Sequence, residues 1–184
     1  MKFMRAFIAI ELPSELKEKI DDVISELEDA DFCDAKWVSE EKLHLTCKFL
    51  GEISKEQAEK VKAVLLAITK STKSFTIQLE GLGHFNQRVL WIGGSSDQQA
   101  ESLAKRIDAD LNKLGFPKED REFSIHLTLA RIKKVYNWAK MKQILAENET
   151  KDFGSFKADK IKLIESILSA KGHTYRELSS FGLQ

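Results

Sequence analysis

The chain has 184 residues, and its 29 basic and 29 acidic side chains give a formal net charge of zero. A broad nucleic-acid-binding surface usually comes with a basic excess, so an RNA partner would be held by one end or by a few nucleotides. The apolar run over residues 6–10 is shorter than a signal-peptide core of about 7–15 residues, and no stretch approaches the roughly 18 apolar residues of a membrane span. Two cysteines are too few for a disulfide framework. We therefore expect a cytoplasmic protein without a membrane segment.

The first half of the chain alternates between strand-like and helix-like patterns. Apolar residues recur every three to four positions in the two helical segments, and Ser54 with Gln57 has the pattern of a capping box. The predicted elements of this half are a strand over 5–11, a helix from Ser14, an extended piece over 36–38, a strand over 43–50 and a helix after Ser54.

The second half repeats this alternation, with no linker rich in Gly, Ser or Pro between the halves. Its predicted elements are strands over 75–79 and 89–92, a helix over 97–115, a strand over 123–132, a helix over 136–147, and two strands over 157–183 that turn at Lys171 and Gly172. The order of elements predicts an α+β fold with two similar lobes related by a pseudo-twofold axis. Each lobe is expected to be an antiparallel sheet with helices outside, and a cleft is expected between them, all within a single domain over residues 1–184.

One short phrase occurs in both halves, each time inside a predicted strand. Successive side chains of a strand point to opposite faces, so each histidine shares a face with the threonine two residues later, while the intervening leucine turns towards the core. Two such strands side by side would line the cleft with two imidazoles and two hydroxyls. The two copies are His44-Leu45-Thr46-Cys47 and His126-Leu127-Thr128-Leu129.

This set of groups suits metal-free chemistry at a phosphodiester. An imidazole has an ordinary pKa of about 6.5, so near neutral pH one ring of a pair can accept a proton while the other donates one. In an in-line displacement at phosphorus, the attacking and leaving oxygens lie on opposite sides, where two opposed histidines can serve them. Hydroxyl donors can hold the non-bridging oxygens. No cofactor is required.

Other interpretations of these residues remain open. A lone histidine in a strand is more often structural than catalytic, although packing alone would favour an apolar residue at both positions. Two histidines and two cysteines could bind zinc, but Cys47 faces away from His44, Cys33 lies in a loop-like region and no carboxylate shares the pattern. We therefore predict no metal site. His84 and His173 stand beside glycines and are expected in solvated turns.

The chain resembles a known family over nearly its full length. It is similar to the two-histidine phosphoesterase superfamily, and within it to the bacterial and archaeal RNA 2′,3′-cyclic phosphodiesterases, also called 2′-5′ RNA ligases. The stretches that carry the resemblance are residues 5–10 with Leu12 and Pro13, residues 37–38 and 43–51, residues 90–93 and 114–116, residues 126–131, and Glu165, Ser166 and Tyr175.

The resemblance implies a bilobal fold and opening of a 2′,3′-cyclic phosphate at an RNA end to leave a 2′-phosphate. In some members it also implies reversible 2′-5′ joining of tRNA halves. His44 would protonate the leaving 3′ oxygen and His126 would activate water, although the residues themselves do not fix which ring does which. Thr46, Thr128 and Arg131 would bind the phosphate.

Strict alternation places Arg131 on the face opposite His126, so its role requires a bulge or a strong twist near Ala130. Lys48 shares the parity of His44 and is an alternative source of positive charge.

The expected partners are RNA ends that carry a cyclic phosphate, including tRNA halves or nucleotides, and the protein is expected to act as a monomer. Trp37, Phe7 and Tyr175 are the rings available to stack on a base. Two other functions stay open: an RNA-end or nucleotide-binding module with little turnover, and joining as the main reaction.

Overall fold

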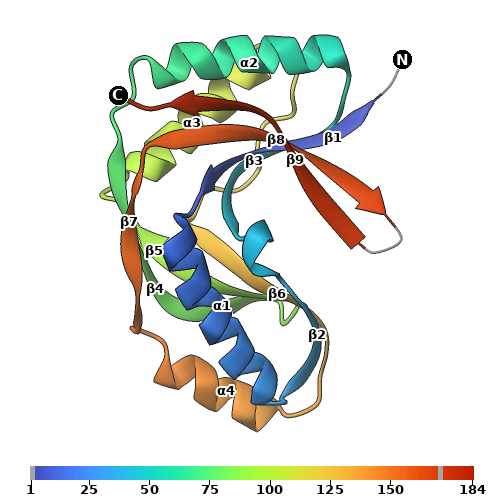
Figure 1. Cartoon of the computed structure of the whole chain (residues 1–184), viewed down its shortest axis with the longest axis vertical. Coiled ribbons are helices and arrows are strands. Elements are labelled where there is room, and N and C mark those ends of the chain that lie inside the picture. Colours follow the sequence, from blue (N-terminus) through green and yellow to red (C-terminus); the bar gives the residue numbers. More distant parts are fainter. Residues whose placement is uncertain (1–2, 170–171) are drawn as a thin grey trace.

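The computed structural model describes residues 3–169 and 172–184, which form two lobes stacked along the long axis of the molecule (Figure 1). The fold is α+β, as predicted. The helices are α1 (Ser14–Asp29), α2 (Lys55–Thr69), α3 (Gln99–Asn112) and α4 (Trp138–Glu147), with a 3-10 turn η1 (Glu40–Lys42). The strands are β1 (Met4–Glu11), β2 (Cys33–Trp37), β3 (His44–Ile53), β4 (Phe75–Phe85), β5 (Val89–Ser95), β6 (His126–Val135), β7 (Asp152–Ala158), β8 (Lys160–Ser169) and β9 (Gly172–Gly182).

The strands of both lobes join in one antiparallel sheet with the order β7-β4-β5-β6-β3-β1-β8-β9, and β2 pairs with the free side of β6. One lobe holds β3, β1, β8 and β9, and the other holds β2, β6, β5, β4 and β7. In the described part of the chain, the two central strands β3 and β6 pair at one position only, where Leu45 lies opposite Leu127. We call this pair of residues the seam between the two lobes of the sheet.

Each lobe is covered by two helices, one of which comes from the other lobe. Helix α1 follows β1 but packs against β7 of the other lobe, and α3 follows β5 but contacts β3 and α2. Figure 1 shows the result, with α2 and α3 over one lobe and α1 and α4 over the other. The pseudo-twofold arrangement of the lobes thus includes an exchange of helices across the axis.

Strands β3 and β6 are near copies of each other. Each begins at its histidine, and the order of buried, half-buried and exposed side chains is the same over their first nine positions. Each also has a bulge after the threonine. In β3, Thr46 and Lys48 lie opposite consecutive residues of β1, so Cys47 between them is the extra residue. In β6, Thr128 and Ala130 lie opposite consecutive residues of β5, so Leu129 is the extra residue.

Most predicted elements are confirmed, but several differ in their bounds. Strand β2 begins at Cys33, three residues before the extended piece expected over 36–38, and β4 runs to Phe85, past its expected end at residue 79. The third strand of the C-terminal part, β7, was not predicted because Gly154, with a φ of +112°, interrupts the alternation between its buried phenylalanines. Strand β3 continues past Gly51 to Ile53. Helix α3 begins at Gln99, two residues later than expected, and the Ser96 hydroxyl oxygen just before it accepts a hydrogen bond from the Ala100 N–H at 2.9 Å. Of the two residues predicted to form the last turn, Lys171 lies outside the described residues and Gly172 is the first residue of β9.

Among the described residues, no helix combines the length and apolar character that a bilayer crossing demands. The capping box is confirmed: Ser54 accepts from the Gln57 N–H at 3.2 Å, while the Gln57 amide oxygen accepts from the Ser54 N–H at 2.9 Å.

Candidate active site

The two histidines of the repeated phrase are held in the same way. His44 Nδ1 lies 2.6 Å from the Lys42 carbonyl oxygen, and His126 Nδ1 lies 2.9 Å from the Ser124 carbonyl oxygen. Because a carbonyl can only accept, Nδ1 carries the proton in each ring, and Nε2 of the neutral ring is left with a lone pair. Each ring can therefore accept or donate a proton at Nε2 without losing the bond that orients it.

The seam brings the two histidines together. In an antiparallel pair centred on Leu45 and Leu127, the residues one step earlier on each strand lie diagonally across the seam, about 7–8 Å apart on regular geometry. The two rings are near enough for a positive charge on His126 to lower the pKa of His44. Both histidines and both threonines are half-buried, on the face predicted from strand alternation.

His44 lies in an enclosed aromatic environment. Its ring centroid is 4.8 Å from that of Phe7 and 5.3 Å from that of Tyr175, which meets it edge-on. The pKa of His44 lies below its ordinary value, chiefly because burial disfavours the charged ring; the Lys42 carbonyl opposes this shift, and the positive charge of Lys17 adds to it. In the free protein the neutral form of the His44 ring is therefore favoured over the charged form.

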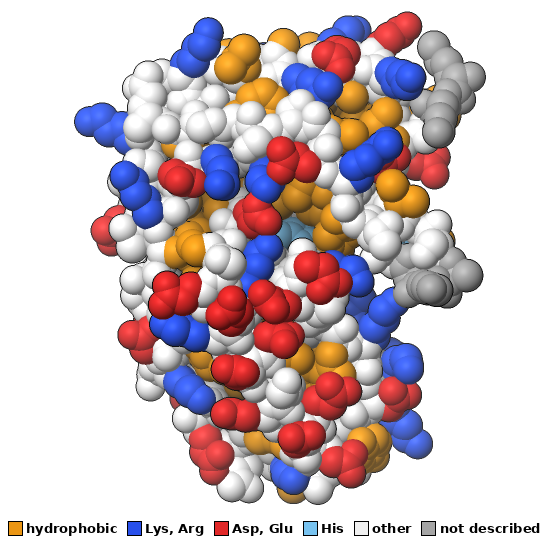
Figure 2. Space-filling view, in the orientation of Figure 1, with side chains coloured by type: hydrophobic (Ala, Val, Ile, Leu, Met, Phe, Trp, Pro, Cys, Tyr) orange, Lys and Arg blue, Asp and Glu red, His pale blue; other side chains and the backbone are white. Residues whose placement is uncertain are grey.

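A pocket of about 160 Å³ gives access to His44. Figure 2 shows a hollow on this face with a histidine at its bottom, among hydrophobic and charged side chains. The residues that line the pocket are Glu11, Lys17, Glu41, Lys42, Leu43, His44, Lys162, Ile164, Tyr175 and Glu177.

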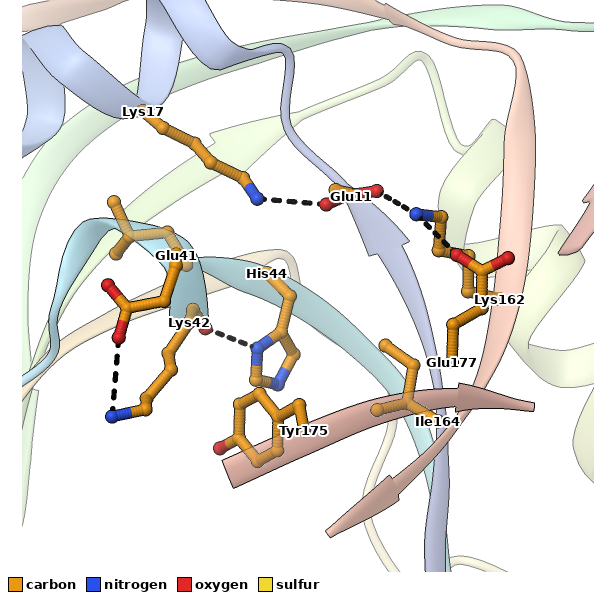
Figure 3. A pocket seen from close by; sticks show the side chains of 10 residues that line it. Glu11, Lys17, Glu41, Lys42, His44, Lys162, Ile164, Tyr175 and Glu177 are labelled. Carbon is orange, nitrogen blue, oxygen red and sulfur yellow. Dashed lines mark hydrogen bonds and ion pairs between the residues drawn. The ribbon is translucent and has the colours of Figure 1, made fainter. Parts of the chain in front are cut away.

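One wall of this pocket is a chain of ion pairs, drawn in Figure 3. The Glu11 carboxylate pairs with Lys17 Nζ at 2.9 Å and also with Lys162, which in turn pairs with Glu177 at 2.7 Å. Burial would raise the pKa of Glu11, but the bonds from Lys162 and Lys17 outweigh burial and hold it below its usual value. Its negative charge in turn raises the pKa of His44.

Glu11 is thus expected to tune His44. In Glu11→Gln, the negative charge that raises the pKa of His44 is removed and Lys17 loses its counter-ion, while Lys162 keeps Glu177, so the pKa of His44 should fall further below its ordinary value. The measurement is the NMR titration of the His44 ring, assigned with a His44→Ala sample; the chain has only four histidines. Glu15→Gln, at an exposed ion pair of α1, is the control and should leave the titration unchanged. An unchanged or raised pKa in Glu11→Gln would contradict the tuning role.

Arg131 lies on the same face as His126 because the required bulge is present. The extra residue Leu129 makes Leu129 and Ala130 both face the core, so Arg131 returns to the exposed face. The positive charge of Arg131 also lowers the pKa of Tyr175 on the other lobe, although burial of that phenol raises it more. Arg131 therefore stands where its charge reaches both lobes.

Lys48 does not contribute charge to the cleft, contrary to the alternation of its strand. The bulge at Cys47 turns it to the opposite face, where its side chain is 2% exposed. Its ammonium donates to Asp108 Oδ1 at 2.6 Å and to the Pro117 carbonyl at 2.8 Å. It ties β3 to α3 and to the loop that leads towards His126.

Two aromatic residues beside His126 were not predicted from the sequence. Phe85 stands edge-on to the His126 ring at 5.2 Å between centroids, and the Trp91 ring lies 5.2 Å from Phe85. Among the rings that were predicted, Phe7 and Tyr175 lie beside His44, whereas Trp37 packs against the core and Phe32. Strand pairing, which the sequence alone does not give, determines these positions.

The remaining histidines lie in strands, not in solvated turns. His84 is a half-buried residue of β4 whose Nδ1 accepts from the Gln87 N–H at 3.1 Å, and His173 in β9 lies 2.9 Å from the Ser166 hydroxyl. The glycine before His84 suggested a turn, but it belongs to the strand and makes room for Trp91.

Within residues 3–169 and 172–184, no group of three or more His, Cys, Asp or Glu side chains has the arrangement of a metal site. Burial also raises the pKa of both thiols, that of Cys47 to about 12, so neither is poised to act as a thiolate ligand.

Comparisons with known proteins show which family this chain is similar to. A model of the AKAP7 2′5′ RNA ligase-like domain matches residues 7–183. The chain is 35% identical over 182 residues to an RNA 2′,3′-cyclic phosphodiesterase of Methanocaldococcus jannaschii, covering 97% of this chain and 100% of the relative. It is also 35% identical over 190 residues to an RNA 2′,3′-cyclic phosphodiesterase of Aquifex aeolicus, covering 100% of this chain and 99% of the relative.

Solved structures share the fold. TT0787 of Thermus thermophilus aligns with a TM-score of 0.82 at 26% identity over 98% of both chains. Escherichia coli LigT in complex with 3′-AMP aligns with a TM-score of 0.83 at 24% identity, over 100% of this chain and 99% of LigT. With two histidine-threonine strands meeting at one seam and relatives of this kind over its whole length, the chain belongs to the RNA 2′,3′-cyclic phosphodiesterase family of two-histidine phosphoesterases.

Proposed function

We propose that this protein is a metal-independent RNA 2′,3′-cyclic phosphodiesterase that opens the cyclic phosphate at an RNA end and leaves a 2′-phosphate. The observation that carries the proposal is the matched pair of histidines, each fixed through Nδ1, with Nε2 available on the same face of one seam. The names of the relatives from Methanocaldococcus jannaschii and Aquifex aeolicus support the substrate class.

The proposed reaction needs only water and the two imidazoles. His126 Nε2 accepts a proton from water as the water oxygen bonds to phosphorus. The bond between phosphorus and the 3′ oxygen breaks on the opposite side, and His44 Nε2 donates a proton to that oxygen. Proton exchange with solvent then resets both rings.

The low pKa of His44 bears on this assignment. Before substrate binds, burial lowers the pKa of the ring and so favours its neutral form, whereas the acid role needs it protonated. A cyclic phosphate carries one negative charge, and its binding beside His44 favours the protonated ring. The acid role therefore depends on the bound phosphate to charge His44.

Thr46, Thr128 and Arg131 are proposed to hold the non-bridging phosphate oxygens. Both threonines are half-buried on the histidine face, and neither hydroxyl is engaged by another residue in the described part of the chain. Arg131 is exposed and offers a planar pair of donors that matches two phosphate oxygens.

Replacing Arg131 is expected to weaken phosphate binding. Charge-assisted hydrogen bonds contribute about 1.5–3 kcal/mol, so Arg131→Ala should lower kcat/KM roughly 10- to 100-fold, and Arg131→Lys should lower it less. Steady-state kinetics on a nucleoside 2′,3′-cyclic phosphate measure this effect. Arg121→Ala, in the charged loop before β6, serves as the control. Wild-type kcat/KM in Arg131→Ala would remove Arg131 from the proposed site.

The deciding experiment offers a defined oligonucleotide that ends in a 2′,3′-cyclic phosphate, in excess chelator, and identifies the phosphate that remains. A 2′-phosphate formed at the metal-replete rate is expected. A 3′-phosphate, or activity lost with chelator, would refute the proposal as stated.

The alternative function is an RNA-end or nucleotide-binding module with little turnover. Tight binding of RNA with a 2′-phosphate end, without hydrolysis of the cyclic form, would establish it in place of the enzyme. In either case we propose that residues 1–184 act as one bilobal domain, as a monomer and in the cytoplasm. RNA ends, including those of tRNA halves, are the proposed partners.

A further inference from the structure

Two exposed cations face each other at the edge of the second lobe. Lys36 of β2 lies directly opposite Arg131 of β6. The residues on either side of Lys36, Ala35 and Trp37, pack against the core, so Lys36 points to the open face of the sheet, which is the face of Arg131 and His126. Lys36 therefore stands beside the proposed phosphate site, on the neighbouring strand.

Nothing in the described part of the chain neutralises this pair of charges. Lys36 and Arg131 are both exposed, and among the residues that the structure describes neither has an ion-pair or hydrogen-bond partner. Like charges directly opposite each other in an antiparallel sheet destabilise the fold. An anion bound between the two side chains would turn this repulsion into two attractions.

Two further cations extend the positive charge along the outer end of β6. Lys133 pairs with Asp34 of β2 at 3.1 Å, and the Arg88 guanidinium donates to the Lys133 carbonyl oxygen at 3.3 Å. In the described part of the chain, Asp34 is the one carboxylate that forms an ion pair with this group. We call Lys36, Arg88, Arg131 and Lys133, all of them exposed, the basic strip. It begins at the proposed phosphate site and leads away from the seam.

The covered side of the same lobe carries the opposite charge. The apolar side of α1 shares the core with Leu127 and Leu129 of β6, so α1 covers the face of the sheet opposite to the basic strip. The exposed charged side chains of α1 are Lys19 and six acids, Glu15, Glu18, Asp22, Glu26, Glu28 and Asp29. Figure 2 shows acidic side chains gathered over the lobe that α1 crosses in Figure 1. The zero net charge of the chain is thus divided, and the open face is the side that attracts a polyanion.

An RNA end offers such a polyanion at the right place. In an RNA substrate, the nucleoside that carries the cyclic phosphate continues through its 5′ oxygen into a chain with one negative charge per nucleotide. A free nucleoside 2′,3′-cyclic phosphate has no such chain. Lysine and arginine are the usual side chains that hold backbone phosphates without reading the sequence.

From this placement we propose that the basic strip binds backbone phosphates of the RNA upstream of the cyclic phosphate. The protein then acts on RNA ends in preference to free nucleotides. Arg131 holds the reacting phosphate, and Lys36 is the first contact with the chain that leads to it. The inference rests on the proposed function and specifies its substrate class.

Two substrates with the same reactive end test this inference. They are uridine 2′,3′-cyclic phosphate and a trinucleotide of uridine that ends in the same cyclic phosphate. Both need the same proton transfers, so the ratio of their kcat/KM values reports what the upstream chain adds. Wild type is expected to favour the trinucleotide, and this preference should shrink as the salt concentration rises, because phosphate contacts release bound counter-ions.

Lys36→Ala should lower the ratio about threefold, as expected for the loss of an exposed charge pair. It should also lower the slope of the logarithm of the ratio against the logarithm of the salt concentration by about 0.7, the value for one contact with a single strand. Lys36→Glu should lower the ratio further, and Lys36→Arg should retain it. The mononucleotide kcat/KM should stay near wild type in all three variants. Lys60→Ala, which removes an exposed lysine of α2, is the matched control.

The repulsion between Lys36 and Arg131 gives a separate check on folding. Because Lys36→Ala removes that repulsion, the urea midpoint of this variant should equal or exceed that of wild type. A lower midpoint would remove the repulsion from which the inference starts.

An unchanged ratio in Lys36→Ala, or a wild type that does not prefer the trinucleotide, would overturn the inference. An equal loss on both substrates would also overturn it, because Lys36 would then act at the cyclic phosphate itself. In each of these outcomes the mononucleotide is still hydrolysed and the proposed function stands. If neither substrate is hydrolysed, the proposed function fails. The Kd values of uridine 2′-phosphate and of a uridine trinucleotide ending in 2′-phosphate then replace the kinetic ratio, with the same expectations for Lys36→Ala.

Discussion

Replacing either His44 or His126 with alanine is expected to lower kcat for the 2′,3′-cyclic phosphate by at least about 100-fold, because each variant lacks one of the two proton transfers. The rings sit diagonally across the seam, so neither can take over the part of the other. Replacing His84, which is half-buried in β4 away from the repeated phrase, is the matched control and should leave kcat near wild type. Activity retained in both catalytic-site variants would end the proposal of a paired acid and base.

The two roles can be separated with a substrate that carries sulfur in place of the bridging 3′ oxygen. A thiolate leaves without a proton, so the variant that lacks the acid should recover most of its lost rate. The assignment made above predicts recovery in His44→Ala and none in His126→Ala. The opposite result would exchange the roles and would agree with the low pKa of His44, which favours a base in the free protein.

Lys48→Ala is expected to lower the free energy of unfolding by about 3 kcal/mol, because removing one partner of a buried ion pair leaves the other uncompensated. Lys48 Nζ lies 2.6 Å from Asp108 Oδ1, and the two side chains are 2% and 13% exposed. Lys62→Ala removes an ion pair with Glu59 on the outer surface of α2 and should cost about 0.5 kcal/mol or less. Urea unfolding of the three proteins compares them directly, and a Lys48→Ala value within about 0.5 kcal/mol of wild type would refute the anchoring role.

The effect of Lys48 should also depend on pH. Burial raises the pKa of Asp108, but the hydrogen bonds from Lys48 and from the Glu119 N–H outweigh burial and hold it below 3.8, its ordinary value. The lowered pKa stabilises the fold above pH 3.8, and this contribution is lost as the pH falls through the pKa of the folded state. The difference in stability between wild type and Lys48→Met should therefore shrink below that pH.

The repeated phrase made much of the site predictable. A histidine and a threonine two positions apart in a strand must share a face, and Leu45 and Leu127 must then face the core, whatever the rest of the fold does. The matching order of elements in the two halves predicted two lobes, and the structure has them.

The positions that the sequence could not give depend on strand register. Alternation assigned Lys48 to the cleft and Arg131 away from it, and a single extra residue in each strand, Cys47 or Leu129, reverses both assignments. Nothing in a linear pattern marks such a bulge. The places of Phe85 and Trp91 likewise follow from which residues pair across β4, β5 and β6.

The exchange of α1 and α3 between the lobes has a mechanical consequence. Neither lobe covers its sheet with its own helices alone, because one of the two helices over each sheet comes from the other lobe. Moving the lobes apart would expose the inner faces of both sheets at once, so the exchange of helices opposes a hinge motion at the seam. A phosphate at the seam would therefore meet two lobes that each carry one of the two histidines and that are tied to each other by both exchanged helices.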